Sequence, residues 1–445
     1  MRWWLVLALV GCGDNSDPRG AFEVVGHTDL GSRGMNAALA IAGDIAYVGS
    51  RIDGKPVLIV DISDPANLNV IGEIGPPAEG VMGMSSRELR ASVDPPLLFI
   101  LNLQCSPSLH GCAAGAGEVE NIKVFDIANP RVPLLLGTRA ITGIRNVTRS
   151  PHEFFLWHDP IDRTRVLALV SAPGIPSLEI LSATGGDPAV VLSFDPYTQG
   201  GVPRGGEDNL LHSVSLSDDG RTMYLSHQTA GLFVADISTV IDQAEVPMVT
   251  MLTPAAQALK FGVMGPHSAV QVPERDLLVT TEEVYPPPFG AGCPWGHVRL
   301  VDVTNKAQPA LLGEYKLPEN DTSCAADAPQ TAFTAHNATT TKNLALVTWY
   351  AGGLQAIDIS DPTAPVQLAE YRPEPLAAVA VEDPGLGGHK VEMWSYPIIK
   401  DGLIYAIDSR NGLYALRYSG RFGEEVRERR FLEGNSNLGA FVARD

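Results

Sequence analysis

The stretch VLIVDISDP at residues 57–65 decides the fold of this chain, because its pattern returns along almost the whole length. Each copy is a short apolar strand that runs into an acidic or polar turn. The further copies are IKVFDIANP (122–130), LEILSATGGDP (178–188), LFVADIS (232–238), VRLVDVTNKAQP (298–309), LQAIDISDP (354–362) and a degraded LYALRYSG (413–420). Equivalent positions are 54 to 66 residues apart. A period of this length is typical of an array of supersecondary units.

Four short strands can be recognised in each repeat. The first and sixth repeats show them most clearly, at 37–41, 45–48, 57–61 and 68–73, and at 338–341, 344–349, 354–358 and 366–371. Seven units of four antiparallel strands predict an all-β fold, a seven-bladed β-propeller in which each sheet packs its faces on its neighbours. A β-solenoid is the alternative, but its repeats are much shorter.

We expect a single propeller over residues 21–420. Its blades are predicted at about 33–79, 80–140, 141–200, 201–255, 256–318, 330–375 and 388–420. The last repeat lacks an outer strand, and residues 21–31 contain a segment that resembles the outer strands of other repeats. These residues are therefore predicted to complete the seventh blade and close the ring, with Val426 to Phe431 as the competing candidate. Residues 421–445 are predicted to form a charged, partly helical tail on the surface.

The aspartate that ends the strand in most copies has a structural explanation. Asp61 and its equivalents can accept backbone hydrogen bonds in Asx turns, and the Asp-Pro or Asn-Pro that follows reverses the chain. Calcium binding is the weaker interpretation, because the spacing of an EF-hand loop is absent.

Residues 57–65 and 354–362 resemble the LVIVD repeat, which defines a bacterial family of extracytoplasmic β-propeller proteins. The resemblance extends over nearly all of residues 21–420 and implies the propeller fold. It implies no particular activity, because the family is named for a repeat and not for a reaction.

The first residues of the chain predict export. Arg2 is followed by an apolar run over residues 3–10 that is too short to span a bilayer, and LVGC at residues 9–12 resembles a bacterial lipobox. The resemblance implies that residues 1–11 are a signal peptide, that Cys12 carries a lipid, and that residues 12–20 tether the protein to a membrane. An ordinary secretory signal is the alternative. Either interpretation predicts an extracytoplasmic protein, and a lipoprotein would face the periplasm or the cell surface.

The remaining cysteines and the charge agree with that location. Four cysteines besides Cys12 are predicted to pair as Cys105–Cys112 and Cys293–Cys324, as expected in an oxidising compartment. The formal net charge is −19, which disfavours nucleic acid as a partner. We expect a monomer.

Four histidines recur at one phase of the repeat, namely His152, His212, His267 and His336. Each opens the first strand of its blade, and first strands lie nearest the axis of a propeller. The four imidazoles are therefore expected to converge at one end of the central channel, where they would suit one divalent iron, copper or zinc ion. The arrangement is similar to that of carotenoid cleavage oxygenases, which are propellers with four axial histidines around iron. Glu88, Glu283 and His389 are candidates for a second shell around such a site.

Two functions remain open at this stage. One is a membrane-anchored binding module for a protein or glycan, in which the histidines only line a polar channel. The other is a metal-dependent oxidoreductase or lyase with the four histidines as ligands. Motifs of α/β-hydrolases, P-loop proteins and dinucleotide-binding proteins are absent from the sequence.

Overall fold

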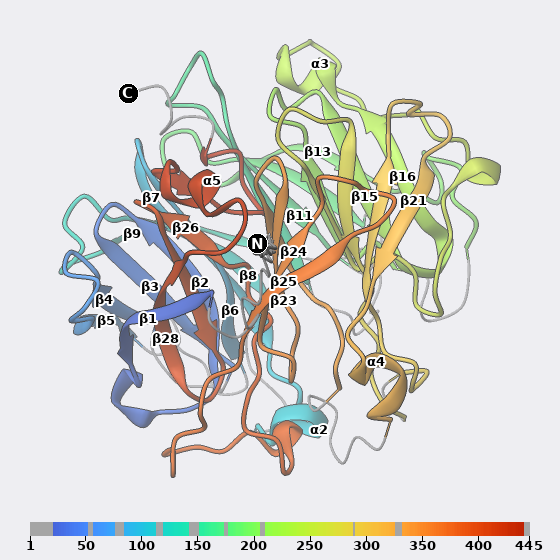
Figure 1. Ribbon diagram of the computed structural model, residues 1–445. Helices are drawn as coiled ribbons and strands as arrows, with labels where there is room; N and C mark the ends of the chain where they lie inside the picture. The colour runs from blue at the N-terminus through green and yellow to red at the C-terminus, as the bar shows by residue number, and fades with distance from the viewer. Residues whose placement is uncertain are drawn as a thin grey trace, which may run out of the picture.

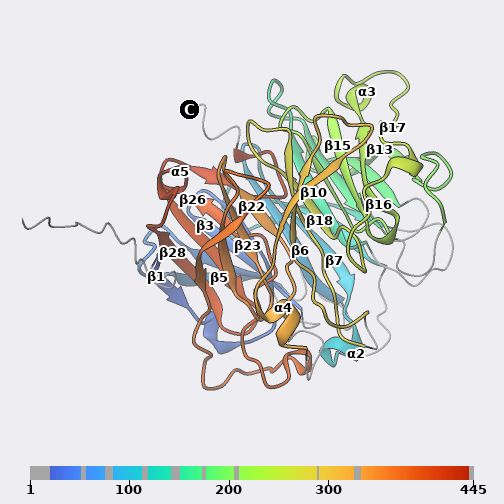
Figure 2. The ribbon, with the colours of Figure 1, turned by 45° about the vertical axis from the view of Figure 1, so that its right-hand side comes forward.

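The computed structural model describes residues 21–51, 57–75, 84–112, 119–141, 151–172, 177–204, 210–287, 290–324 and 332–439. Over these ranges the chain is an all-β propeller with four-stranded antiparallel blades (Figures 1 and 2). Within the same ranges, no helix is both long enough and apolar enough to cross a membrane. Cys12 and the rest of residues 1–20 lie outside the described part of the chain.

Four blades are separate sheets whose strands pair in chain order. The first two are β10 (Glu153–His158), β11 (Val166–Ser171), β12 (Leu178–Ser182) and β13 (Ala189–Phe194), then β14 (Ser213–Leu216), β15 (Thr222–His227), β16 (Gly231–Asp236) and β17 (Thr250–Met251). The other two are β18 (Ser268–Gln271), β19 (Leu277–Thr281), β20 (Val298–Asp302) and β21 (Ala310–Tyr315), then β22 (Ala338–Thr340), β23 (Leu344–Thr348), β24 (Leu354–Asp358) and β25 (Val366–Tyr371).

One sheet has eight strands and corrects the prediction of seven separate blades. Its strands are β2 (Asn36–Ala42), β3 (Ile45–Ser50), β4 (Val57–Asp61), β5 (Asn69–Ile74), β6 (Met84–Val93), β7 (Pro96–Gln104), β8 (Asn121–Asp126) and β9 (Leu134–Ala140). The first four and the last four are each a four-stranded antiparallel unit. A pairing of Ser50 with Ser86 joins β3 to β6, so backbone hydrogen bonding continues from one unit into the next.

The fifth separate sheet contains both ends of the described chain. Its order is β1 (Phe22–Thr28), β28 (Gly412–Tyr418), β27 (Leu403–Asp408), β26 (Ile398–Lys400) and β29 (Phe431–Leu432). The antiparallel pairing of β1 with β28 confirms that the amino-terminal strand joins the last repeat. Figure 1 shows this contact as the blue strand beside the red one. The competing segment, Val426 to Phe431, does not take that edge, because β29 pairs with β26 on the opposite side of the sheet.

Burial explains why the inner strands are continuous apolar runs. In β11, β15 and β23 every residue is buried, since neighbouring blades cover both faces of these strands. The outermost strands β5, β13 and β21 are largely exposed and more polar. The predicted Asx turns are confirmed. In each of five turns the carboxylate accepts a hydrogen bond of 2.7–2.9 Å from the backbone N–H of the residue two positions later, and the aspartates are Asp61, Asp126, Asp236, Asp302 and Asp358.

The carboxyl-terminal segment differs from the predicted surface tail. A short helix, α5 (Gly423–Arg427), is present, but residues 433–438 are mostly buried. The backbone N–H of Leu156 donates to the carbonyl of Asn435, and the Asn437 side chain exchanges two 2.8 Å hydrogen bonds with the backbone of His158. The tail is drawn inward because β29 extends the sheet edge at β26 and the polar residues that follow satisfy the free edge of β10.

Both predicted disulfides, Cys105–Cys112 and Cys293–Cys324, are present. Their loops contain α2 (Pro107–His110) and α4 (Glu319–Thr322), which lie at the same face in both views, away from α3 (Ser238–Ile241) (Figures 1 and 2). The remaining short helices are η2 (Leu30–Ser32), η3 (Gln228–Ala230), η4 (Ala255–Gln257) and η6 (Pro384–Leu386). We call the face that carries the two disulfide loops the disulfide face. The second strand β7 ends there, at the start of the Cys105 loop, and a first strand such as β10 begins at the same end of its blade. The first strands therefore start at the disulfide face.

Candidate metal centre

Four histidines occupy the same position in four successive blades. Each lies one or two residues before a first strand, and together we call them the histidine row: His152, His212, His267 and His336. Their backbone N–H groups donate at 2.8–2.9 Å to carbonyls on the neighbouring second strands, those of Ser171, Ser226, Thr281 and Thr348. The repeat phase recognised in the sequence is therefore a true structural equivalence.

Hydroxyl groups tie the histidine row together from blade to blade. In each case a side chain of one blade donates to the carbonyl of the histidine in the next. These bonds run from Ser171 to His212 (2.6 Å), from Ser213 to His267, and from Ser268 to His336 (3.1 Å). The main chain at each of these three histidines is consequently fixed by two sheets, which makes the row rigid.

The imidazole rings form one continuous cluster. Successive ring centroids in the histidine row are 4.3, 3.9 and 4.2 Å apart. His212, His267 and His336 are buried and His152 is half-buried. Consecutive rings of the four predicted histidines are therefore in contact.

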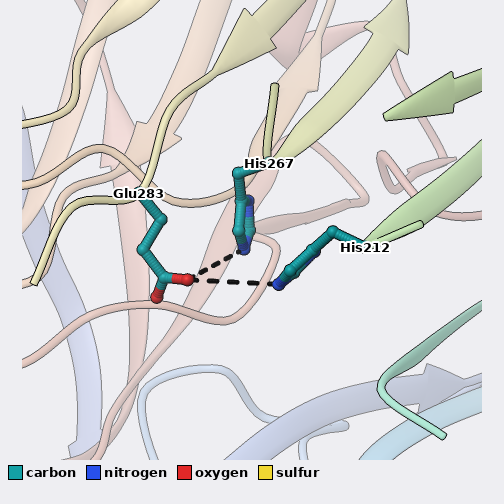
Figure 3. Close-up of side chains that lie close together, drawn as sticks. All are labelled: His212, His267 and Glu283. Atoms are coloured by element: carbon teal, nitrogen blue, oxygen red, sulfur yellow. Dashed lines mark ion pairs between the residues drawn. The ribbon is translucent and has the colours of Figure 1, made fainter. Parts of the chain in front are cut away.

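Glu283 supplies a carboxylate to this cluster from the loop after β19. Its Oε2 lies 3.5 Å from Nε2 of His267 and 4.0 Å from Nε2 of His212, and its Oε1 lies 3.4 Å from Nε2 of His336. Figure 3 shows the carboxylate facing the rings of His267 and His212. Ligand atoms of Glu283 and these two histidines all lie within 4.8 Å of one another.

These separations suit ligands of a shared ion better than direct hydrogen bonds. A charge-assisted N–H···O bond is roughly 2.8 Å long, shorter than all three distances. Two ligand atoms each bound at roughly 2.1 Å to one ion, at a tetrahedral angle, are roughly 3.4 Å apart. The 3.5 Å value for His267 matches that figure, and the 4.0 Å value for His212 corresponds to a wider angle at the ion. His336 lies against the other carboxylate oxygen, so an ion shared with it would bind Glu283 through both oxygens. The chemistry of the donors, imidazole and carboxylate, suits Zn²⁺, Fe²⁺ or Cu²⁺.

Buried ring nitrogens in the cluster lack hydrogen-bond partners. Nε2 of His267 and Nδ1 of His212 are both in this state among the residues that the structure describes. Most buried polar atoms in proteins are satisfied, and an exception calls for an explanation such as a bound ion. An ion at the cluster would satisfy Nε2 of His267.

The partners of the other ring nitrogens leave lone pairs directed at the cluster. Nδ1 of His336 lies 2.7 Å from the carbonyl of Trp394, which can only accept, so the neutral ring carries its hydrogen on Nδ1. Nδ1 of His267 lies 3.4 Å from the hydroxyl of Thr281. Hydrogen bonds of this kind to the outer nitrogen orient histidine ligands in metal proteins.

The local environment lowers the pKa values of three histidines and of Glu283 alike. Burial, with a smaller contribution from neighbouring rings, lowers the pKa of His152, His212 and His267 well below the usual 6.5. Burial acts to raise the pKa of Glu283, but its histidine neighbours outweigh burial and hold that pKa well below 4.5. Neutral imidazole and ionised carboxylate are the forms that bind metal ions.

Two tyrosines extend the cluster toward the disulfide face. The hydroxyl of Tyr350 donates to Oε1 of Glu283 at 2.5 Å, and the hydroxyl of Tyr285 lies 2.7 Å from that of Tyr350. Burial, followed by the charge of Glu283, raises both tyrosine pKa values well above 10, so both hydroxyls stay protonated. They orient the carboxylate and can donate to a ligand.

Sequence comparison assigns the repeat. The sequence model of the LVIVD repeat family matches residues 33–74 and 343–372. The chain contains LVIVD repeats at these two segments. LVIVD repeats form β-propellers, in agreement with the blades described above. No curated protein matches the chain at a significant level.

Two of the residues proposed for a second shell in this LVIVD-repeat protein lie elsewhere. Glu88 is buried beside Arg90, whose guanidinium is 3.2 Å from its carboxylate and 3.7 Å from that of Glu153. His389 is exposed and its ring packs edge-on against Phe333. The interpretation of Glu88 as the blade-two equivalent of the histidines is wrong by one residue, because Glu88 pairs with Leu101 as Glu153 pairs with Ser171, which places Arg87 at the position of His152.

Sequence reasoning missed several residues at the centre, including Tyr350, Arg87 and Trp394. A signal for Tyr350 exists, because Glu283 and Tyr350 each lie two residues after the residue whose carbonyl binds the histidine N–H, Thr281 and Thr348 respectively. The same phase that aligns the histidines thus aligns the carboxylate and the hydroxyl. That phase also identifies Arg87, because it directly precedes Glu88 as His152 directly precedes Glu153.

Proposed function

We propose that this LVIVD-repeat protein binds one divalent transition-metal ion on the propeller axis and that the ion is its working centre. Nε2 of His212, Nε2 of His267, Nε2 of His336 and the carboxylate of Glu283 are the ligands, with His152 at the edge of the site. The observation that carries the proposal is the set of 3.4, 3.5 and 4.0 Å separations between the carboxylate and the three imidazoles. They suit a shared ion and are too long for direct charge-assisted bonds.

A metal at this position would supply Lewis-acid or redox chemistry beside protonated tyrosine hydroxyls. Ligands from three different blades hold the site rigid, and half-buried His152 marks the side from which a substrate approaches. At the other end of β10 the backbone is occupied by Asn435 and Asn437 of the carboxyl-terminal segment, so the disulfide face is the side of entry. An oxidoreductase or lyase is the corresponding class of enzyme.

The seven four-stranded units form one closed ring in this proposal. The pairing of β1 with β28 supports closure, and the single pairing of Ser50 with Ser86 supports counting the eight-stranded sheet as two blades. The protein is extracytoplasmic and tethered to the membrane through a lipid on Cys12. Two disulfides support an oxidising compartment.

A non-catalytic binding module is the second candidate. The propeller fold by itself supports an interaction role, and in that case the histidine row would be a polar lining that orders the axis and a protein or glycan would bind the loops. Metal content distinguishes the two functions.

The test is the metal content of purified full-length protein produced with iron, copper, zinc and manganese available. We expect about one tightly bound ion per chain, with loss of the ion in the variants His212→Ala and His267→Ala. His297→Ala is a matched control, because His297 also faces a glutamate, Glu314 at 3.2 Å, but lies on an outer sheet position. Protein without metal, or metal content unchanged in both cluster variants, would reject the metal centre and leave the binding module.

A further inference from the structure

Trp394 forms a platform beside the histidine row. Its carbonyl accepts the hydrogen on Nδ1 of His336, and its ring lies edge-on to the His336 ring with centroids 5.6 Å apart. The indole N–H donates to the hydroxyl of Ser409 at 3.0 Å, which fixes the orientation of the ring. A group that stacks on this indole is therefore held at a defined place next to the metal ligand His336.

Two guanidinium groups lie over this indole. The Cζ atom of Arg51 is 4.6 Å from the centroid of a Trp394 ring and that of Arg87 is 5.5 Å away. Arg51 has a carboxylate partner, because its guanidinium lies 2.8 Å from the buried carboxylate of Glu392. Arg87 has no carboxylate within ion-pair distance in the described residues, and its buried Nε has no hydrogen-bond partner there.

A β-bulge directs Arg87 to this position. The pairing of β6 with β7 advances from Ser86 opposite Asn102 to Glu88 opposite Leu101, so Arg87 is the extra residue. A bulged residue leaves the regular alternation of the strand, and bulges commonly re-aim a side chain beside a functional site. Arg87 thus stands in blade two where His152 stands in the next blade, whereas its neighbour Glu88 points to Arg90.

The field of Arg87 reaches the histidine row. Burial is the main cause of the lowered pKa values of His152, His212 and His267, and the Arg87 guanidinium contributes to each of them. The imidazoles do not neutralise the positive charge of Arg87, because neutral rings carry no negative charge.

The charges of the occupied centre do not cancel without another anion. A divalent ion contributes two positive charges and Arg87 and Arg51 contribute one each, while Glu283, Glu392 and Asp383 contribute one negative charge each, so one positive charge is left over. Buried or partly buried charge is stable in proteins when it is paired. The half-buried guanidinium of Arg87, together with a further coordination position beyond the four protein ligands, therefore creates a site for negative charge on the entry side.

We propose that the metal centre takes a small organic carboxylate as its ligand or substrate, one oxygen on the metal ion and the carboxylate paired with the guanidinium of Arg87. The inference rests on the proposed metal centre and names its substrate class. The planar fork of a guanidinium matches the two oxygens of a carboxylate, and the Trp394 ring, 5.5 Å from Cζ of Arg87, holds that fork beside His336. Arg87 is in this role a substrate-positioning residue.

The experiment uses full-length protein loaded with Co²⁺, whose visible d–d absorption reports on the coordination sphere. The spectrum is followed during titration with acetate, with the neutral isostere acetamide and with inorganic phosphate. We expect saturable spectral changes with acetate and none with acetamide at equal concentration. In Arg87→Gln the acetate affinity should fall by about tenfold or more, with one Co²⁺ per chain retained and partial recovery in Arg87→Lys. Arg204→Gln is the matched control, since Arg204 also lies 5.5 Å from an aromatic ring, Tyr197, but on an exposed loop.

The outcomes separate this inference from the proposed function. Wild-type protein that binds no Co²⁺ rejects the metal centre itself. Protein that binds Co²⁺ but responds equally to acetate and acetamide, or whose acetate affinity is unchanged in Arg87→Gln, rejects the anion site alone. Tighter binding of phosphate than of acetate rejects the assignment to carboxylates. Loss of Co²⁺ in both Arg87→Gln and Arg87→Lys would assign Arg87 a structural role and overturn the inference.

Discussion

Glu282 and Glu283 are adjacent in the sequence but face different partners, and substituting each by glutamine separates folding from metal binding. Glu282 is 2% exposed, accepts the backbone N–H groups of Val263 and Met264, and lies 2.9 Å from the guanidinium of Arg299. Glu283 faces the histidine row and Tyr350 instead. Each substitution keeps the shape of the side chain and removes one negative charge.

The expected magnitudes follow from these contacts. Breaking a buried ion pair costs about 3–5 kcal/mol. The amide oxygen introduced by Glu282→Gln would keep both backbone hydrogen bonds and Arg299 retains Glu314 at 3.6 Å, so we expect this variant to lower the free energy of unfolding by about 2–3 kcal/mol. In Glu283→Gln the hydroxyl of Tyr350 keeps an acceptor, so the metal-free protein should change by less than about 1 kcal/mol. Its metal affinity should fall by about a hundredfold, equivalent to about 2.7 kcal/mol, because the only charged ligand is lost.

Urea unfolding of the metal-free proteins and competition for Zn²⁺ against a chelator of known affinity give the two quantities. The expected pattern is crossed: Glu282→Gln is unstable with near-normal Zn²⁺ affinity, and Glu283→Gln is stable with weak affinity. Equal Zn²⁺ affinity in wild type and Glu283→Gln would refute the assignment of Glu283 as a ligand. A comparable loss of affinity in both variants would show that general destabilisation, not ligation, controls the site.

Three further predictions concern stability. Burial lowers the pKa of His227 to about 4, below the 6.5 of an unfolded chain, so the stability that the neutral ring contributes is complete above pH 6.5 and is lost as the pH falls toward 4. Between pH 7.5 and 4.5, the free energy of unfolding of His227→Gln should therefore fall by about 2 kcal/mol less than that of wild type in urea titrations. Parallel pH profiles of the two proteins would contradict this. Asn437→Ala removes both hydrogen bonds to the backbone of His158 and should lower the free energy of unfolding by about 2 kcal/mol. In Asn435 the side-chain oxygen is unpartnered among the described residues, so Asn435→Ala should lower it by less than about 1 kcal/mol. Similar losses of stability in both variants would contradict this assignment. Deleting residues 21–31 exposes the edge of β28 and should produce aggregation on size-exclusion chromatography, and a stable monomer would count against the role of β1.

The repeated strand-turn units were predictable because their determinants are local. Asp61 and its equivalents hydrogen-bond to groups two residues away, and each apolar run is one strand. The joining of β1 to β28 was also predictable, since the last repeat visibly lacks a strand. The joining of two units through Ser50 and Ser86 was not, because it depends on how closely two sheets approach.

Some parts of the candidate site were also predictable from the sequence and others were not. Histidines at one phase of a repeat must meet at one level of the fold, so the histidine row could be predicted from spacing alone. The assignment of Glu88 to the histidine position is wrong by one residue, because the end of a strand cannot be located to a single residue without its pairing register. The buried carboxyl-terminal segment was misread because its charged composition suggests solvent, while Asn435 and Asn437 make backbone hydrogen bonds that only the folded blades provide.

The sequence by itself determined the blade, its turns and the phase of the four histidines, because these depend on strand alternation and on hydrogen bonds within a few residues. Only the tertiary structure decided that Glu283 faces three imidazoles, that Arg87 leaves its strand to lie over Trp394, and that the chain's end covers the far end of β10. Those contacts join residues tens to hundreds of positions apart. Their geometry is set by the packing of blades around the axis, which no local pattern encodes.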